Sequence, residues 1–347
     1  MSNKGHKLII AAPKASPLYQ RARSHGLKVY PVAFKKSAFI TDYFKLVGIF
    51  KSERPHVLNT HGNTDSKIAL PAGKHAGINC RILSRHISAH VSNNWYNRLL
   101  YKMFSHYTFT TAHCTTNHLQ TTFDLDKAQV MSMASGIIEP SQLPSRDQAH
   151  AALAENLGVD AKTRFIGFVG RVSHDKGVDL ILDAFRQLAD HIPHHLIIVG
   201  TGIEEYLSQL QQMAEDFQLS HRIHFPGFTD NVWPIYRALE LKVLASREKN
   251  GIPFEGIPQA VLEAMYAGCP VVGSNSGGIA DIIHHGTTGL LFDIDNPGQL
   301  AEMMMDSISN PTQTQKRTQR ARKHVQTHHT IDAMGEKTLE IYNNHYA

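Results

Sequence analysis

Two carboxylates, Glu255 and Glu263, stand eight residues apart around the start of a predicted helix. Pro258 suits the first turn of a helix and Gly268 suits its end, so the sequence predicts a helix over about 258–267. Glu255 then lies beside unpaired backbone N–H groups and the positive end of that helix, which favour an anion. One carboxylate can accept hydrogen bonds from sugar hydroxyls and the other from a ribose, with a phosphate between them.

The two faces of the predicted helix differ. At about 100° per residue, Glu263 shares a face with Gln259, Ala260 and Ala267. Val261 and Met265 point the opposite way, toward a core, so the carboxylate faces out over small side chains. The plainer interpretation is that Glu255 is only an acid favoured by the helix dipole and Glu263 only an exposed helix residue. Both interpretations fit this segment taken alone.

Two cations flank a turn earlier in the chain. Residues 165–169 predict a strand, a polar turn follows, and an amphipathic helix runs through Leu188. Arg171 and Lys176 lie in that turn. A guanidinium offers a planar fork for phosphate oxygens and an ammonium a mobile point charge, so the pair could neutralise a diphosphate leaving group. An isolated pair of this kind is also typical of a solvated surface turn.

The order and spacing of four motifs resemble glycosyltransferase family 4, the retaining GT-B enzymes. The resemblance covers nearly the whole chain, is strongest from about 160 to 305, and extends to members that build lipopolysaccharide cores and other envelope glycans. The motifs are Gly170-Arg171-x4-Lys176-Gly177, Gly200-Thr201-Gly202, Glu255-x7-Glu263 and Gly277-Gly278.

The resemblance implies a role for each matched residue. Arg171 and Lys176, next to Gly170, would bind the donor diphosphate. Glu255 would contact the transferred sugar, and Glu263 would hold the ribose hydroxyls.

Two further segments belong to the expected donor site. The backbone N–H groups of Gly256 and Ile257 lie at the helix start, and Gly227 and Phe228 resemble the place where backbone groups read the nucleotide base.

Two histidines of the N-terminal half lie just past predicted strands, at the sheet edge where open α/β sheets bind ligands. His86 matches the family's histidine near the donor sugar and reacting centre. His61 matches a frequent neighbour at the cleft, and Arg85 is a candidate for the acceptor side. Because the chain has 23 histidines, an ordinary structural role for any one of them stays open.

Apolar runs alternate with helical patterns along the chain, which is the signature of parallel sheets with crossover helices. With the resemblance, this predicts an α/β GT-B fold of two Rossmann-like domains facing a cleft. The expected domains are 1–150 with a returning C-terminal helix over 330–347, and 151–329. Residues 139–148 are the expected linker.

The predicted strands fall into two groups of six. They are 7–12, 28–33, 56–59, 80–83, 107–111 and 128–131 in the first domain, and 165–169, 195–199, 223–225, 241–244, 270–272 and 290–292 in the second.

One departure from the family stands at the N-terminus. Family members begin with a strand, a Gly-Gly loop and a helix before a Gly-His-x-Val strand, whereas residues 4–10 here look like that second strand already. The sequence therefore predicts that the first strand-loop-helix unit is missing, through an upstream start, a reduced acceptor domain or a loss of activity. There are three smaller departures: this chain has Glu240 where the family has Asp, Ala245 where the family has Pro, and Asp281 where the family has Glu.

Charge is divided unequally between the halves. Residues 1–150 hold 19 Lys+Arg and 7 Asp+Glu, a net +12, and the remaining residues hold 16 and 23, a net −7, which together give +5. The strongly basic N-terminal half is suited to an anionic partner, here a phosphorylated glycolipid or an anionic membrane surface. Nucleic acid is the competing partner, but the sequence has no recognised nucleic-acid motif.

Composition narrows the class of protein further. The chain has 347 residues, 42% of them hydrophobic, enough for two cores. No segment approaches the roughly 18 to 20 apolar residues that span a bilayer, so a cytoplasmic protein, peripheral on the inner membrane, is expected. Its three cysteines form no CxxC pair, which points to reduced thiols rather than a disulfide framework or zinc ribbon.

The expected function is that of a metal-independent retaining hexosyltransferase without a cofactor. It would move a sugar from a nucleotide-diphosphate sugar, with uridine diphosphate the commonest in the family, to an anionic glycan or glycolipid such as lipopolysaccharide core. Two alternatives remain: an inactive sugar-nucleotide-binding protein or subunit of a heteromeric transferase, and an epimerase or hydrolase that turns over donor alone.

Overall fold

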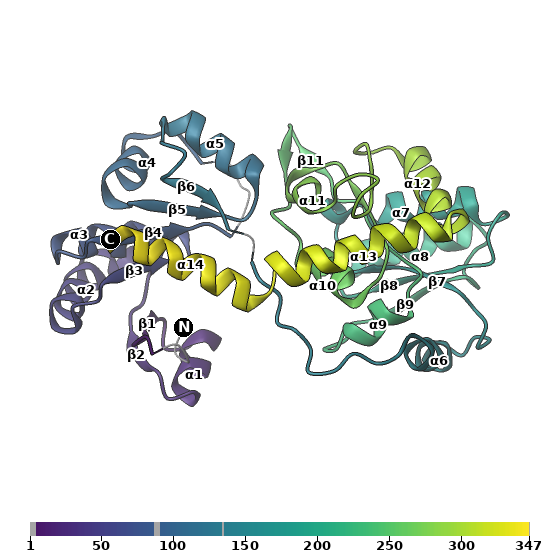
Figure 1. The fold of residues 1–347 in the computed structure, drawn as a ribbon, viewed down its shortest axis with the longest axis horizontal. Coiled ribbons are helices and arrows are strands. Elements are labelled where there is room, and N and C mark those ends of the chain that lie inside the picture. The colour runs from purple at the N-terminus through teal and green to yellow at the C-terminus, as the bar shows by residue number, and fades with distance from the viewer. Residues whose placement is uncertain (1–4, 87–90, 134, 347) are drawn as a thin grey trace.

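The computed structural model describes residues 5–86, 91–133 and 135–346. Two α/β domains lie side by side, and the last two helices cross from one to the other (Figure 1). Each strand expected from the sequence is present, and all of these strands pair in parallel. The structure adds a short antiparallel hairpin, β11 (Glu248–Lys249) and β12 (Ile252–Pro253), that the sequence did not predict.

The first domain contains a two-stranded and a four-stranded parallel sheet. The four-stranded sheet has the order β3-β4-β5-β6. The strands are β1 (Ile9–Ala12), β2 (Lys28–Pro31), β3 (Val57–Thr60), β4 (Cys80–Ser84), β5 (Tyr107–Thr110) and β6 (Val130–Ser132). The helices are α1 (Pro17–Ser24), α2 (Phe39–Glu53), α3 (Asn63–His75), α4 (Trp95–Leu99) and α5 (His113–Phe123).

The N-terminal segment forms a small sheet of its own. Strand β1 leads through a short loop into α1, and β2 then pairs with β1 in parallel, with Ile9 opposite Lys28. Among the described residues no strand pairing joins the β1-β2 sheet to the β3-β4-β5-β6 sheet. A parallel pair of this kind fits the second and third strands of the family's fold as well as the first and second. The expectation that residues 4–10 belong to the second strand is therefore not contradicted, and it stays a prediction.

The second domain is built on one parallel sheet of order β14-β13-β10-β7-β8-β9. Its strands are β7 (Phe165–Val169), β8 (His195–Val199), β9 (Ile223–Gly227), β10 (Leu241–Leu244), β13 (Val271–Ser274) and β14 (Leu290–Phe292). Its helices are α6 (Arg146–Leu157), α7 (Val178–Leu188), α8 (Glu204–Asp216), α9 (Trp233–Ala238), α10 (Gln259–Ala267), α11 (Gly277–Ile282), α12 (Pro297–Ser309) and α13 (Pro311–His328). Buried side chains of these elements form one continuous core.

The chain crosses between the domains at two places. Residue 150 falls inside α6, which packs against α9. After α13, helix α14 (Ile331–Tyr346) runs back onto the first domain (Figure 1), where the Tyr342 hydroxyl accepts from Asn59 at 3.5 Å and His345 Nδ1 lies 3.2 Å from the Tyr107 hydroxyl. The C-terminal helix thus joins the first domain.

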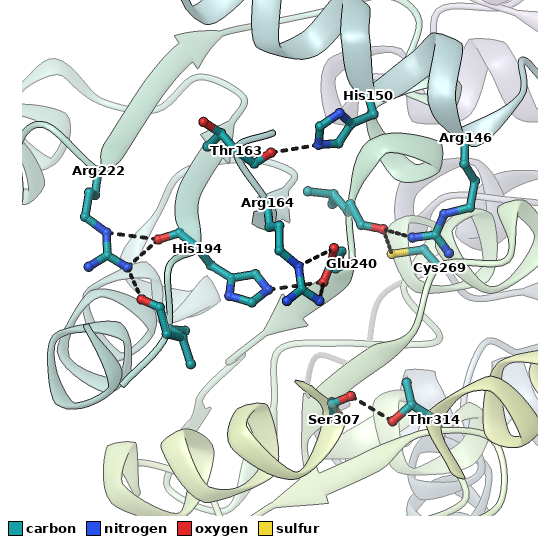
Figure 2. Close-up of polar contacts among 12 residues, drawn as sticks. Arg146, His150, Thr163, Arg164, His194, Arg222, Glu240, Cys269, Ser307 and Thr314 are labelled. Atoms are coloured by element: carbon teal, nitrogen blue, oxygen red, sulfur yellow. Dashed lines mark hydrogen bonds and ion pairs between the residues drawn. The ribbon is translucent and has the colours of Figure 1, made fainter. Parts of the chain in front are cut away.

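A polar cluster closes the amino edge of the second sheet, at the end of β7 and β10 remote from their carboxyl loops (Figure 2). Glu240 accepts from Arg164 Nε at 2.6 Å and contacts His194 Nε2 at 3.1 Å. Arg222 donates to the His194 carbonyl at 3.0 Å. Burial alone would raise the pKa of Glu240, but its hydrogen bonds with His194 and Arg164 outweigh burial and lower the pKa to about 2. Glu240, in place of the family's Asp, has a structural role.

None of the helices in the described part of the chain combines the length and apolar character needed to cross a bilayer.

Candidate functional site

The loops after β7 and β8 meet at the carboxyl edge of the second sheet. A Cβ on Gly200 would lie 1.8 Å from the Gly170 carbonyl oxygen, so only glycine allows these two loops to touch. Gly177, with φ of 62°, would place a Cβ 2.1 Å from the Ala245 oxygen. The glycines that the sequence analysis singled out therefore allow the loop that carries Arg171 and Lys176 to pack closely against the end of β10.

Lys176 and Glu255 form the centre of the site. Lys176 Nζ makes an ion pair with Glu255 Oε1, and the Ser246 hydroxyl donates to the same oxygen at 3.0 Å. Glu255 is only 9% exposed. The carboxylate stands just before α10, as predicted, and the structure brings it directly to the cation of the β7 loop.

Arg171 lies in the same loop but points elsewhere. Its guanidinium donates to Asp175 Oδ2 at 3.1 Å, and its side chain is 68% exposed. It therefore remains accessible to an incoming anion.

Glu263 is half-buried on α10. The Tyr236 hydroxyl donates to its Oε2 at 3.2 Å. Burial raises the pKa of Glu263, while the hydrogen bond from Tyr236 and the charge of Lys242 oppose that rise. Val261 and Met265 are fully buried, as the helical spacing predicts.

Helix α10 is more enclosed than the sequence suggests. Ala267, expected to share the open face of Glu263, is fully buried, because α13 packs on α10.

Gly227 and Phe228 lie where β9 ends. Gly227 has φ of 81°, and its carbonyl accepts from the Gly200 N–H at 2.8 Å, which joins this segment to the β8 loop. The Phe228 ring is 69% exposed. An aromatic face is thus presented to solvent beside the glycine loops.

The two predicted histidines of the first domain contact each other. His61 Nδ1 lies 2.9 Å from His86 Nε2, and the rings stack with centroids 5.2 Å apart. Partial burial lowers the pKa of both imidazoles. Asp65 fixes the loop by accepting from the backbone N–H of His61 at 3.0 Å. Arg85, which directly precedes His86, donates to the Tyr101 hydroxyl at 3.4 Å.

Backbone contacts join the domains beside α10. The Ile257 N–H donates to the Thr111 carbonyl at 3.1 Å, and a Cβ on Gly256 would lie 2.2 Å from Thr111 Oγ1. The His113 N–H donates to Asp281 at 2.6 Å. Gly256 and Ile257, predicted as donor-site residues, therefore also form the contact with the first domain.

Four residues of this region escaped the sequence analysis. Ser246 and Tyr236 hold the two glutamates, Lys242 lies buried beneath them, and Arg247 anchors the cation loop. Ser246 alone carried a signal, because it lies two residues past a predicted strand.

The family follows from the sequence of the second domain. Residues 151–324, half of the chain, match the family model described as glycosyl transferases group 1. The chain is a group 1 glycosyl transferase. The parallel sheets of its two domains and its structural neighbours show the GT-B fold expected from the sequence.

Curated glycosyltransferases match a little under half of the chain. A D-inositol 3-phosphate glycosyltransferase of Corynebacterium jeikeium is 31% identical over 170 residues, which is 46% of this chain and 39% of that protein. The lipopolysaccharide core biosynthesis mannosyltransferase LpsB of Rhizobium meliloti is 34% identical over 159 residues, which is 44% of this chain and 43% of that protein. Each match covers less than half of the relative's length.

Solved structures match over the whole chain. A glycosyltransferase from Rickettsia africae has a TM-score of 0.88 at 16% identity, covering 99% of this chain and 92% of its own. Alr3699/HepE of Anabaena, solved with UDP, has a TM-score of 0.82 at 18% identity, covering 97% of this chain and 92% of its own. Both domains of the group 1 chain thus share the fold of these proteins.

Proposed function

We propose that this chain is a retaining hexosyltransferase of glycosyltransferase family 4 that uses a nucleoside diphosphate sugar. The observation that carries the proposal is the Lys176 and Glu255 pair at the start of α10. A cation for the diphosphate and a carboxylate for the sugar lie in contact, as they would if both faced the bond between sugar and phosphate. Glu263, eight residues on, then receives the ribose hydroxyls.

The donor that fits best is a uridine diphosphate sugar. Alr3699/HepE, which shares the fold, was solved with UDP and with UDP-glucose. In this chain the exposed Phe228 and the Gly227 backbone stand beside the glycine loops, where a base can stack and accept hydrogen bonds. The Tyr236 hydroxyl holds Glu263 for the ribose.

The chemistry proposed at this site needs charge stabilisation for a leaving diphosphate. The bond between the anomeric carbon and the phosphate oxygen breaks, and an acceptor oxygen bonds to the same face of the sugar. The acceptor proton passes to the departing phosphate. Arg171, Lys176 and the N–H groups at the start of α10 stabilise the charge on that phosphate, so we propose that no metal is required.

The acceptor would meet the donor from the first domain. His61 and His86 lie at the carboxyl edge of the β3–β4 sheet, and both imidazoles favour the neutral form, which can accept as well as donate a hydrogen bond. The first 150 residues carry a net +12. These features, with the match to LpsB, support an anionic glycan or glycolipid such as lipopolysaccharide core.

We also propose that the protein works at the cytoplasmic face of the inner membrane. On helix α2 the side chains of Ile40 and Phe44 are 70% and 63% exposed, and the exposed Lys35 and Lys36 lie a few residues before the helix. Apolar side chains beside lysines suit an anionic lipid surface. Sedimentation with phosphatidylglycerol vesicles should carry the protein down, and Ile40→Asp should abolish this while Ile203→Asp, an exposed site in the other domain, should not.

The decisive experiment compares binding with transfer. UDP, GDP and ADP should be titrated into the protein by calorimetry, and sugar transfer then measured with the nucleotide that binds. Glu255→Gln should abolish transfer and leave the melting temperature near that of the parent. Glu302→Gln, on the exposed face of α12, is the matched control. Full transfer by Glu255→Gln, or no binding of any nucleotide, would refute the proposal.

A further inference from the structure

Arg247 follows β10 and Ser246, and it spans three segments of the carboxyl edge. Its side chain is 23% exposed. The guanidinium donates to both oxygens of Asp179, from Nη1 at 2.8 Å and from Nη2 at 2.7 Å. Nε donates to Asp295 at 2.9 Å, and Nη1 donates to the His174 carbonyl at 3.0 Å. One side chain thus joins the cation loop, the first turn of α7 and the loop after β14.

The backbone of the same residue strengthens the connection. The Arg247 N–H donates to the Asp175 carbonyl at 2.9 Å. The two carbonyls held by Arg247 therefore belong to the residues directly before Lys176. Because Lys176 must reach Glu255 across 79 residues of sequence, the position of this short turn decides where the ammonium lies.

Asp179 is held on its other side as well. The Tyr206 hydroxyl donates to Asp179 Oδ1 at 2.8 Å, and the Tyr206 ring lies over His174 with centroids 3.9 Å apart. Burial would raise the pKa of Asp179, but the hydrogen bonds from Arg247 and Tyr206 overcome it and lower the pKa. The carboxylate thus stays ionised and keeps the bidentate contact with Arg247.

Arg247 has little capacity left for a ligand. A guanidinium has five N–H groups, and four of the five are used by Asp179, Asp295 and His174. Arg171, by contrast, contacts Asp175 and is largely exposed. Arg247 therefore acts on the loop, whereas Arg171 remains available to an anion.

We propose that Arg247 is a positioning residue for the donor diphosphate: through Asp179, Asp295 and the His174 and Asp175 carbonyls it fixes the turn that places Lys176. This inference rests on the proposed function, because it assigns Lys176 to the diphosphate. It predicts that loss of Arg247 weakens contacts to phosphate while contacts to the base and ribose, made from β9 and α10, remain.

Calorimetric titrations with UDP and with uridine separate these contacts. Arg247→Ala should weaken UDP binding by about tenfold, the effect of a misplaced charged hydrogen bond, and leave uridine binding unchanged. The UDP affinity of Arg247→Lys should lie between those of the parent and Arg247→Ala, because lysine keeps the charge but lacks the planar guanidinium. Arg186→Ala, an arginine on the outer face of α7 paired with Asp183, is the matched control and should change neither affinity.

A second variant tests the route through Asp179. Asp179→Asn should reproduce the selective loss of UDP affinity, and the double variant with Arg247→Ala should be no weaker than Arg247→Ala alone, because both act through one contact. Unchanged UDP affinity in Arg247→Ala would overturn the inference, and so would an equal loss of UDP and uridine, which indicates general damage. If the parent binds uridine and UDP equally well, the diphosphate role of Lys176 fails, and the proposed function fails with it.

Discussion

Replacing Lys242 by methionine should raise the free energy of unfolding of the second domain. Lys242 lies in β10, the side chain is fully buried, and its Nζ has no hydrogen-bond partner among the described residues. Burial lowers the pKa of its ammonium to about 8, although the nearby Cys269 and Glu255 favour the charged form. Methionine keeps an unbranched apolar chain and removes the unpaired charge.

The size of the effect follows from the pKa shift. A fall in the pKa of Lys242 from 10.5 to about 8 corresponds to about 3 kcal/mol, at about 1.4 kcal/mol per pH unit. Because the folded-state pKa is the lower one, the penalty is complete below about pH 8, where both states hold the proton. It declines as the pH rises toward 10.5, and about 1 kcal/mol remains at pH 10.

Two tryptophans make the assay specific to a domain. Trp95 lies in the first domain and Trp233 in the second, so fluorescence in a Trp95→Phe background follows the second domain alone. Urea midpoints of parent and Lys242→Met should be compared at pH 7 and pH 10, with the exposed Lys249→Met as control. The variant should be more stable at pH 7 and lose most of its advantage at pH 10. Equal or lower stability at pH 7 would show that the ammonium is solvated or paired, and the reasoning would be wrong.

Three further outcomes are expected. Glu240→Gln should destabilise the protein by about 1 to 2 kcal/mol at pH 7 after allowance for solvent screening. Because the folded state stabilises the ionised carboxylate, this difference in stability should shrink as the pH falls from about 4.5 toward 2. Urea midpoints measured across that pH range check this. Burial raises the pKa of the Cys269 thiol to about 12, so iodoacetamide should leave it unlabelled in the folded protein, as judged by mass spectrometry. Gly256→Ala should lower transfer activity by at least tenfold, since the added methyl meets Thr111 Oγ1 at the domain contact; Thr111→Ala in the same chain should recover part of it, and a single variant with full activity would contradict this role.

The elements could be predicted because their signals are local. Buried parallel strands are continuous apolar runs, and Phe165–Val169 or His195–Val199 fit no other element of a globular domain as well. The start and end of α10 follow from Pro258 and Gly268, which act on their own backbone. The short apolar run of Ile9–Ala12 matches two positions in the family's fold, and its composition does not distinguish them, because a strand's position depends on its neighbours in the sheet.

The sequence by itself determined the α/β fold, the group 1 family and which side chains can carry charge at the candidate site, because these depend on residue type and spacing along the chain. Only the tertiary structure decided which of these residues meet: Lys176 contacts Glu255, His61 stacks on His86, and Arg247 holds the turn that carries Lys176 against the start of α7. Such contacts join residues far apart in sequence, and they depend on glycine-sized approaches of loops and on helix packing, which no local pattern encodes.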